Sequence, residues 1–457
     1  MSTTAGRVAT AEWIGLVGLY AFALFAQLSV AGAYLAMALM LTGMILMPRV
    51  TLLPMLRSPL FWTTCAIAAY VVVHAWASAR EFPQTAADQW RGMGDYGHLA
   101  LFLWFPAFWL SGRPDRMRVA LALFVAGVLV RTLIYAPWGN MGAFLSGALP
   151  PYKPDMWHIP YGLYVAIALA ATLLVGAPAV YAMKRGRVRT LLALLLVLVV
   201  LILLEAIVLT KSRGVWVMVL VTAPVAAWLA AARLWPRSAT GTQPRRRRAV
   251  AVGSVLVVLA AAILANLDTI VDRASREQAT YAAILSDNVA NVPPSSVGER
   301  IHLWYDALKH IAERPLVGWG PGSQRMIIQQ IPYIRHATES RPGYSPPSHV
   351  HDLYLSILMR LGVTGFVLFL LMLVLLLRRG WRAHSSGALD DDLAVFLIAS
   401  LLAILVWSLT DIRFHHWDFN MVFALLAGAA VALGSPRIWP RATIRGHLAG
   451  AGEAAAG

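Results

Sequence analysis

Long apolar runs recur along the whole of this 457-residue sequence and are separated by mostly short polar connections. About 20 consecutive apolar residues are enough to cross the hydrocarbon core of a bilayer as an α-helix. A mean hydropathy of +0.65, with 13% charged residues against roughly 25% in soluble chains, excludes a soluble globular protein. We therefore predict an all-α polytopic membrane protein with about twelve transmembrane helices. The predicted spans are residues 12–28, 30–47, 59–79, 95–111, 117–136, 161–182, 190–210, 214–233, 249–266, 352–377, 392–410 and 418–434.

The charges of the connections indicate how these spans are oriented. One set of connections, which includes both ends of the chain, carries 22 Lys and Arg residues, whereas the short connections of the other set carry six. Lys and Arg are concentrated in cytoplasmic loops, so both termini are predicted to be cytoplasmic. The net charge of +16 then records orientation and gives no reason to expect nucleic acid as a partner. The basic run at 245–248 is interpreted as a cytoplasmic anchor.

One connection is much longer than the others. Residues 267–351 fall between spans 9 and 10 on the far side of the membrane, where long segments are not bound by the charge rule. Helical-looking stretches and Pro-rich turns predict a small, mostly helical periplasmic loop domain there. The predicted organisation is 1–266 for spans 1–9, 267–351 for this domain, 352–434 for spans 10–12 and 435–457 for a cytoplasmic tail.

Charged side chains at the outer ends of spans are informative, because charge at membrane depth is costly unless it is paired or hydrated. Arg213 lies between two apolar runs and must sit at the outer boundary, and Arg300 heads an amphipathic stretch of the long loop. Arginine is suited to forked binding of phosphate oxygens. Two alternatives stay open: Arg213 as an interfacial side chain that reaches toward water, and Arg300 as a salt-bridge partner of Glu299 or Asp306.

A pair of histidines precedes the tenth span. The sequence His-Val-His at 349–351 is followed by Asp352, a plausible N-cap. His351 is then expected at the mouth of a helix whose amide groups and dipole favour an anion. On a regular helix Gly362 and Gly365 project within roughly 20° and 40° of His351, and small residues allow close helix contact. We predict that the histidine face packs inward; a structural neighbour of the cap is the alternative.

This histidine segment carries a resemblance to a known family. His351-Asp352, nine further residues and then Gly362-Val-Thr-Gly365 resemble the histidine motif of bacterial O-antigen ligases. The sequence departs from the family pattern at two positions. Asp352 stands where Asn, Ser or Gln is usual, and Arg360 stands where relatives often carry an acid.

Two other segments extend the resemblance. Residues 299–304 and 313–322 are similar to the far-side stretch of the wider O-antigen ligase and polymerase superfamily, and Thr-x-Ser-Arg-Gly at 210–214 is similar to its first arginine motif. The motifs cover only about 60 residues, but their order, span placement and sidedness also match a family of roughly twelve-span proteins with one large periplasmic loop.

The resemblance implies an inverting, metal-independent glycosyltransferase of the bacterial inner membrane. It would move O-antigen polysaccharide from undecaprenyl diphosphate to lipid A-core on the periplasmic face and so complete lipopolysaccharide. On this interpretation Arg213 and Arg300 neutralise the leaving diphosphate, each contributing about 2–4 kcal/mol. His351 is the base that deprotonates the acceptor hydroxyl, with His349 as its substitute.

The remaining site predictions concern substrate contacts and metals. Besides His349, the residues predicted to contact the diphosphate or the acceptor are Arg131, Arg80, Arg360 and Asp352. No metal or cofactor is predicted, because the long loop holds no closely spaced acidic pair and the single cysteine, Cys65, gives no thiolate site. Asp411, His415 and His416 follow the eleventh span; a wet interfacial loop is favoured there over a metal site.

Three rival functions stay open. A polymerase of O-antigen or a protein O-oligosaccharyltransferase would share the arginines and the histidine, although one dominant loop and the short C-terminal part favour the ligase. A transporter or flippase of polysaccharide lipids would be expected to show internal repeats and broken helices at mid-membrane, which the sequence does not suggest. Essential roles for Glu205 and Arg360, with His351 dispensable, would favour transport.

Overall fold

A computed structural model describes residues 2–145, 149–233, 278–285, 292–293, 295–385 and 390–433, with the single positions 264, 267, 271 and 275. The described residues form helices and loops and contain no strand. The helices are α1 (Ser2–Phe25), α2 (Val30–Ile45), α3 (Pro48–Leu56), α4 (Pro59–Glu81), η1 (Pro83–Thr85), α5 (Ala86–Leu101), α6 (Trp104–Leu110), α7 (Pro114–Ile134), η2 (Trp138–Asn140), α8 (Met141–Leu145), α9 (His158–Ala171), η3 (Thr172–Gly176), α10 (Ala177–Tyr181), α11 (Arg187–Leu209), α12 (Arg213–Arg233), α15 (Gln278–Leu285), α16 (Ser296–Glu313), α17 (Gln324–Gln330), α18 (Pro332–Ser340), α19 (Leu353–Ser385), α20 (Asp391–Trp407) and α21 (Trp417–Leu433).

The predicted all-α architecture with several membrane-spanning helices is confirmed for the described residues. Among the described residues, six helical stretches are long and apolar enough to cross a membrane, and a seventh is possible if α2 and α3, bent by 95°, count as one span. Helices lie on eleven of the twelve predicted segments. The remaining predicted span, 249–266, falls outside the described residues except for Leu264. The predicted tail at 435–457 also falls outside them. The count of twelve spans therefore stays a prediction.

One predicted span differs from the structure. The segment 95–111 was expected to be one helix but comprises the end of α5, a short turn and α6. Helix α5 begins nine residues earlier, at Ala86, because its amphipathic first half packs along α4. This first half brings the Gln89 side chain next to the long loop, where its carbonyl accepts the amide of Gly322 at 2.8 Å.

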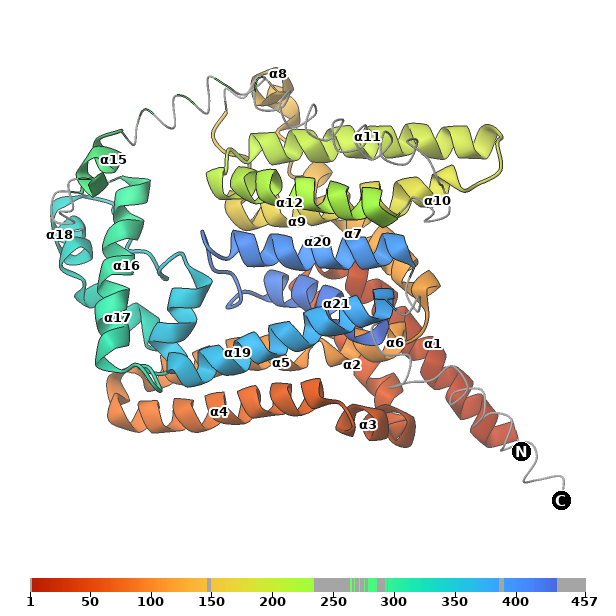
Figure 1. Ribbon diagram of the computed structural model, residues 1–457, viewed down its shortest axis with the longest axis horizontal. Coiled ribbons are helices and arrows are strands. Elements are labelled where there is room, and N and C mark those ends of the chain that lie inside the picture. Colours follow the sequence, from red (N-terminus) through yellow and green to blue (C-terminus); the bar gives the residue numbers. More distant parts are fainter. Residues whose placement is uncertain are drawn as a thin grey trace.

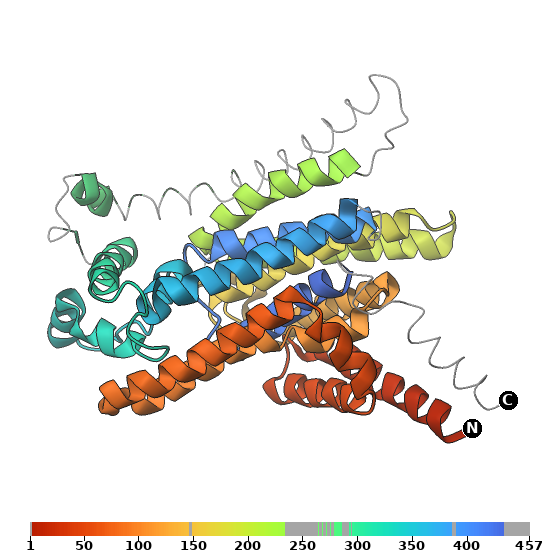
Figure 2. The ribbon, with the colours of Figure 1, turned by 60° about the horizontal axis from the view of Figure 1, so that its bottom comes forward.

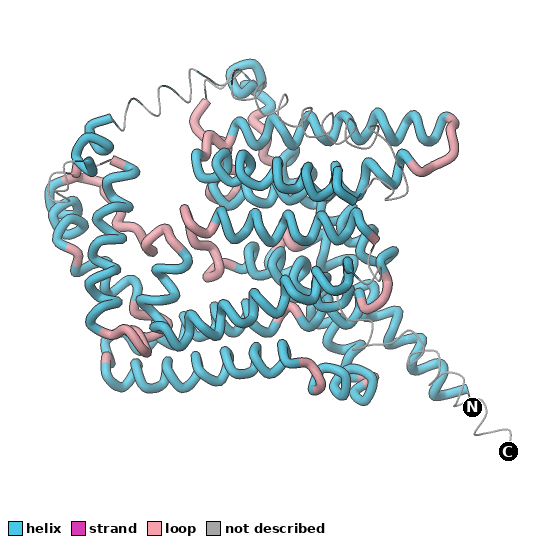
Figure 3. The backbone as a smooth tube through the Cα atoms, viewed as in Figure 1, coloured by secondary structure: helices cyan, strands magenta, loops and turns pink. Residues whose placement is uncertain are grey.

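The helices lie side by side as a bundle with two distinct ends (Figure 1). At one end, on the left of the view, α15 to α18 gather beyond the ends of α4 and α19, and the connections that follow α11 and α20 lie at this same end. The N-terminus, α3 and the connection from α10 to α11 lie at the other end, as a turned view also shows (Figure 2). Loops are most extensive at the end with α15 to α18 (Figure 3).

A small second core connects the long loop to the bundle. Helices α16, α17 and α18 share a hydrophobic cluster that includes Leu303, Ile328 and Ile334. Val350 and Met359, from the approach to α19 and from α19 itself, belong to the same cluster. Burial of this apolar surface fixes α16 against the start of α19, and with it the residues on either side of Val350.

Helix α19 is interrupted at Gly362, which has φ 63° and ψ −171°. The backbone of 315–320 docks into this break. The amides of Trp319 and Gly320 donate to the carbonyls of Met359 and Arg360, at 3.0 and 2.9 Å, and two amides of α19 donate back to 315 and 316. A Cβ at 362 would lie 2.4 Å from backbone atoms of Leu316, so only glycine fits.

The predicted use of the glycines is therefore wrong in its geometry. His351 precedes α19 and has φ 54°, so it does not lie on the helix from which its face was projected. Gly362 serves backbone pairing with the long loop instead of helix packing. Gly365 does face a neighbouring side chain, since its Cβ would lie 3.2 Å from the Tyr70 ring. Small residues are indeed required at both positions. The projection from His351 fails because the helix is not regular across the break at Gly362.

Candidate active site

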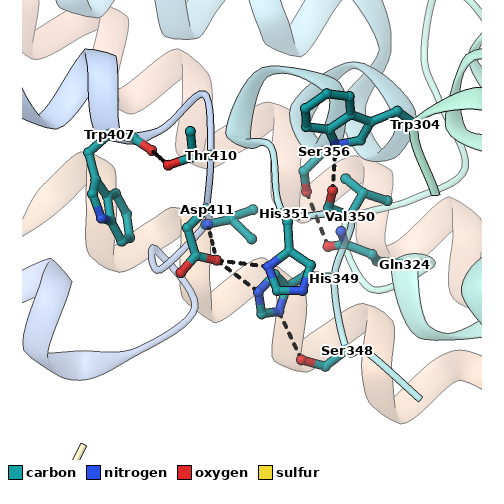
Figure 4. A network of polar contacts seen from close by, with 11 residues as sticks. Trp304, Gln324, Ser348, His349, Val350, His351, Ser356, Trp407, Thr410 and Asp411 are labelled. Carbon is teal, nitrogen blue, oxygen red and sulfur yellow. Dashed lines mark hydrogen bonds and ion pairs between the residues drawn. The ribbon is translucent and has the colours of Figure 1, made fainter. Parts of the chain in front are cut away.

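Two histidines converge on one buried carboxylate at the end of the bundle that carries the long loop (Figure 4). His349 Nε2 lies 3.1 Å and His351 Nδ1 lies 3.2 Å from the same oxygen, Oδ1 of Asp411. Asp411 is 5% exposed, and its Oδ1 also accepts the amide of Ile412 at 2.9 Å. The predicted wet interfacial loop is therefore wrong for Asp411, which lies inside the protein as a hydrogen-bond acceptor for both histidines.

The local backbone explains how the histidines reach this carboxylate. Asp352 caps α19 as predicted, since its Oδ1 accepts the amide of Leu355 at 2.8 Å. The left-handed φ of His351 turns the chain just before the cap. The amide of Leu353 then donates to the carbonyl of Ser408 at 2.9 Å, which holds the approach to α19 against the loop that carries Asp411.

Electrostatics favour an ionised Asp411 beside a neutral His349. Burial opposes ionisation of Asp411, but the hydrogen bonds from His349 and His351 outweigh it and hold the pKa of this carboxyl well below its usual range. Burial also lowers the pKa of His349. Farther along the loop, burial and the neighbouring Arg413 lower the pKa of His416 to about 4.

The hydrogen bonds distinguish the two rings. An ionised carboxylate only accepts, so His351 carries its proton on Nδ1 and leaves Nε2 as its basic nitrogen. His349 donates from Nε2 to Asp411, and its Nδ1 is 2.9 Å from the hydroxyl of Ser348, so both of its nitrogens are engaged. The geometry therefore favours His351 over His349 as a base.

One face of α16 links the other two predicted catalytic residues to this cluster. Ser296, Arg300 and Trp304 are spaced four apart, which places them on one face of the helix. Arg213 Nη2 lies 3.4 Å from the hydroxyl of Ser296. The indole of Trp304 donates to the carbonyl of Val350, between the two histidines, at 2.8 Å. On this face Arg300 lies between Ser296, which contacts Arg213, and Trp304, which contacts the histidine segment.

A second contact ties Arg213 to the histidine cluster. Arg213 begins α12, and the next residue, Gly214, lies against Thr410; a Cβ at 214 would be 2.5 Å from the Thr410 hydroxyl. Thr410 directly precedes Asp411. Arg213, Arg300 and His351 therefore come from three elements but share neighbours at one end of the bundle.

The three other arginines predicted to contact substrate make contacts within the protein. Arg131 is buried and donates to the carbonyls of Pro154, at 2.9 Å, and Gln27. Arg360 is buried, donates to the carbonyl of Pro321 and lies over the rings of Tyr96 and Phe414. Arg80 is exposed and lies over the Trp76 ring. Substrate contact by these three arginines stays a prediction; the contacts seen are structural.

The structure adds residues that the sequence left unassigned. Asp411 was noted only as part of a polar loop, and Ser296, Trp304 and Thr410 were not singled out. Asp411 is 60 residues from His351, so no spacing rule connects them. The one signal was an acidic residue between two apolar runs on the far side, which is costly unless it is paired.

Comparison with protein families finds a match in the part of the chain that carries the motifs. The model of a family described as O-antigen ligase matches residues 197–370. This match supports a relationship of the chain to the O-antigen ligase and polymerase superfamily. A search of curated proteins found no match.

The matched segment contains much of the candidate site. It includes α12, α16 to α18 and the first part of α19, and so covers Arg213, Arg300, His349 and His351. Asp411 lies outside it. Members of the family are glycosyltransferase-like enzymes that act as ligases or polymerases, with polysaccharide and lipid-linked substrates in general. Imidazole and guanidinium groups at one end of a membrane bundle suit such chemistry.

Proposed function

We propose that this protein is an O-antigen ligase, an inverting and metal-independent glycosyltransferase that moves O-antigen polysaccharide from undecaprenyl diphosphate to lipid A-core. The observation that carries the proposal is the Asp411–His351 hydrogen bond, which orients a basic nitrogen in a chain that matches the O-antigen ligase family. The common end that Arg213 and Arg300 share with this histidine supports the assignment.

The proposed reaction is a single displacement. Nε2 of His351 removes the proton of an acceptor hydroxyl while that oxygen bonds to the anomeric carbon of the donor sugar. The bond from this carbon to the diphosphate oxygen breaks, and its electron pair leaves with undecaprenyl diphosphate. Arg213 and Arg300 neutralise the growing negative charge, which is the role that a metal ion has in other lipid-linked transfers. Asp411 holds the His351 tautomer and stabilises the imidazolium that forms.

The proposed setting is the bacterial inner membrane, with about twelve spans, both termini in the cytoplasm and the histidine end in the periplasm. The charges support this orientation. Lys184, Arg185, Arg187 and Arg189 cluster where α10 connects to α11, at the end opposite the histidines, as expected for a cytoplasmic face.

Lipopolysaccharide gels of cells that carry single variants test the function. Arg213→Ala, Arg300→Ala and His351→Ala should each abolish most of the high-mass ladder, leave free core and accumulate lipid-linked glycan. Arg335→Ala and His336→Ala, on the exposed side of α18, are matched controls and should keep the ladder at equal membrane expression. Loss of glycan lengthening with capping intact would indicate a polymerase instead. Essential Glu205 and Arg360 with dispensable His351 would indicate transport.

The stereochemistry of the product tests the mechanism separately. A single displacement inverts the anomeric centre, so the new linkage should have the configuration opposite to that of the donor, as measured by NMR of the purified product. Retention would require a covalent intermediate and would exclude His351 as a simple base. Chelation of divalent metals with EDTA should not lower the transfer rate, because the arginines supply the positive charge.

A further inference from the structure

Two imidazoles and a carboxylate meet closely enough to bind a metal ion together. One ligand atom from each of His349, His351 and Asp411 lies within 4.8 Å of the other two. The two histidine rings have centroids 4.3 Å apart, and the ring of His415 lies 5.2 Å from that of His349. Within the residues that the structure describes, this is the cluster of histidine and acidic side chains with metal-ligand spacing.

The donor set and its support suit zinc. Two histidine nitrogens and one carboxylate oxygen are a common catalytic zinc set, and tetrahedral bonds of about 2.0–2.2 Å place ligand atoms about 3.3–3.5 Å apart. The Asp411–histidine distances of 3.1 and 3.2 Å are already near this value. Metal-binding histidines usually bond through their other nitrogen to a supporting group, and Ser348 offers its hydroxyl to His349 in this way.

We propose that His349, His351 and Asp411 bind Zn²⁺ or a similar first-row divalent ion, and that this ion switches off the transferase. Binding follows from the cluster alone, whereas inhibition rests on the proposed function. The metal takes Nδ1 of His351, so the proton that Nδ1 carries in its hydrogen bond to Asp411 moves to Nε2. Nε2 then donates a hydrogen bond where the reaction needs it to accept a proton. Zinc acts as an inhibitor, and the transfer itself needs no metal.

Binding is tested directly on purified, detergent-solubilised protein. Co²⁺ is the spectroscopic probe, and Zn²⁺ is titrated by calorimetry. One equivalent should bind, with a visible absorption band of nearly tetrahedral Co²⁺. His349→Ala, His351→Ala and Asp411→Asn should each weaken binding at least tenfold, whereas His336→Ala, an exposed histidine, should not. Three ligand variants, each checked by its thermal melt, keep the test valid if one fails to fold. Equal binding by all variants, or no binding by the wild type, would overturn the site.

Inhibition is tested with the transfer assay. Zn²⁺ should stop transfer over the same range of Zn²⁺ concentration in which calorimetry shows the site to fill. EDTA should then restore the full rate. A protein that binds Co²⁺ but keeps its rate with Zn²⁺ would overturn the inhibitory role and leave the binding site in place. Full activity of His351→Ala without any metal would instead overturn the proposed function, so the two failures are distinguishable.

Discussion

At the scale of single residues, Asp411 determines what His351 can do. Its position in the polar loop that follows the eleventh predicted span could be predicted from the sequence, and so could the cap formed by Asp352. The pairing with His349 and His351 could not, because it joins loops 60 residues apart through one shared oxygen. Only the packing of α19 against α20 and α21 brings these loops together.

Asp411→Asn should slow transfer by about 10²-fold or more, the scale of general-base catalysis. Asn is nearly the same size, but its neutral amide no longer selects the Nδ1–H tautomer of His351 or stabilises the imidazolium. The measurement is kcat and KM of the purified variant. A fall in kcat with little change in KM is expected; a change in KM alone would contradict the positioning role.

At the scale of elements, α19 shows the limit of apolar patterns. Its start and its apolar run could be predicted closely, from 352 against the observed Leu353. The break could not, because the apolar run continues beyond Gly362 and the partner backbone at 315–320 is distant along the chain. The same limit applies to α5 and α6, where packing along α4 and not hydropathy determines the helix boundaries.

Gly362→Ala should destabilise the protein and Gly380→Ala should not. Both glycines lie in α19, but at 362 the positive φ with an extended ψ, a combination that essentially only glycine adopts, costs an alanine about 1–3 kcal/mol, and its Cβ would meet the backbone of Leu316. A Cβ at 380 meets nothing within 4 Å, and alanine favours helix. Thermal melts in detergent should show a lower midpoint for the first variant only. Equal midpoints would mean that the loop does not depend on the break.

At the scale of the whole molecule, charge alone predicts how the connections divide into two sets. The excess of Lys and Arg in alternate connections divides the chain without any knowledge of packing, and in the structure α16 and the connections that follow α11 and α20 lie at one end of the bundle (Figure 1). What the charges could not give was the arrangement within that end, which depends on α16 and its contacts with Arg213 and Val350.

Cysteine labelling tests the proposed orientation. In a Cys65→Ser background, His336→Cys should react with a membrane-impermeant maleimide added to cells with a permeabilised outer membrane. Lys184→Cys, at the opposite end of the bundle, should react only after the inner membrane is opened. Both positions are exposed, so the result depends on which side of the inner membrane each cysteine faces and not on its burial in the protein. The reverse pattern would place the histidines in the cytoplasm and exclude the proposed function.

A double-mutant cycle on the two arginines tests the central claim, that Arg213 and Arg300 neutralise the same leaving diphosphate. Transfer rates are measured for the wild type, Arg213→Ala, Arg300→Ala and the double variant with purified protein and defined donor and acceptor. A shared diphosphate predicts that the double variant loses less than the two single losses combined, with a coupling of about 0.5–3 kcal/mol. Losses that add to within about 0.3–0.5 kcal/mol would mean that the two guanidinium groups act at separate places and would contradict the account.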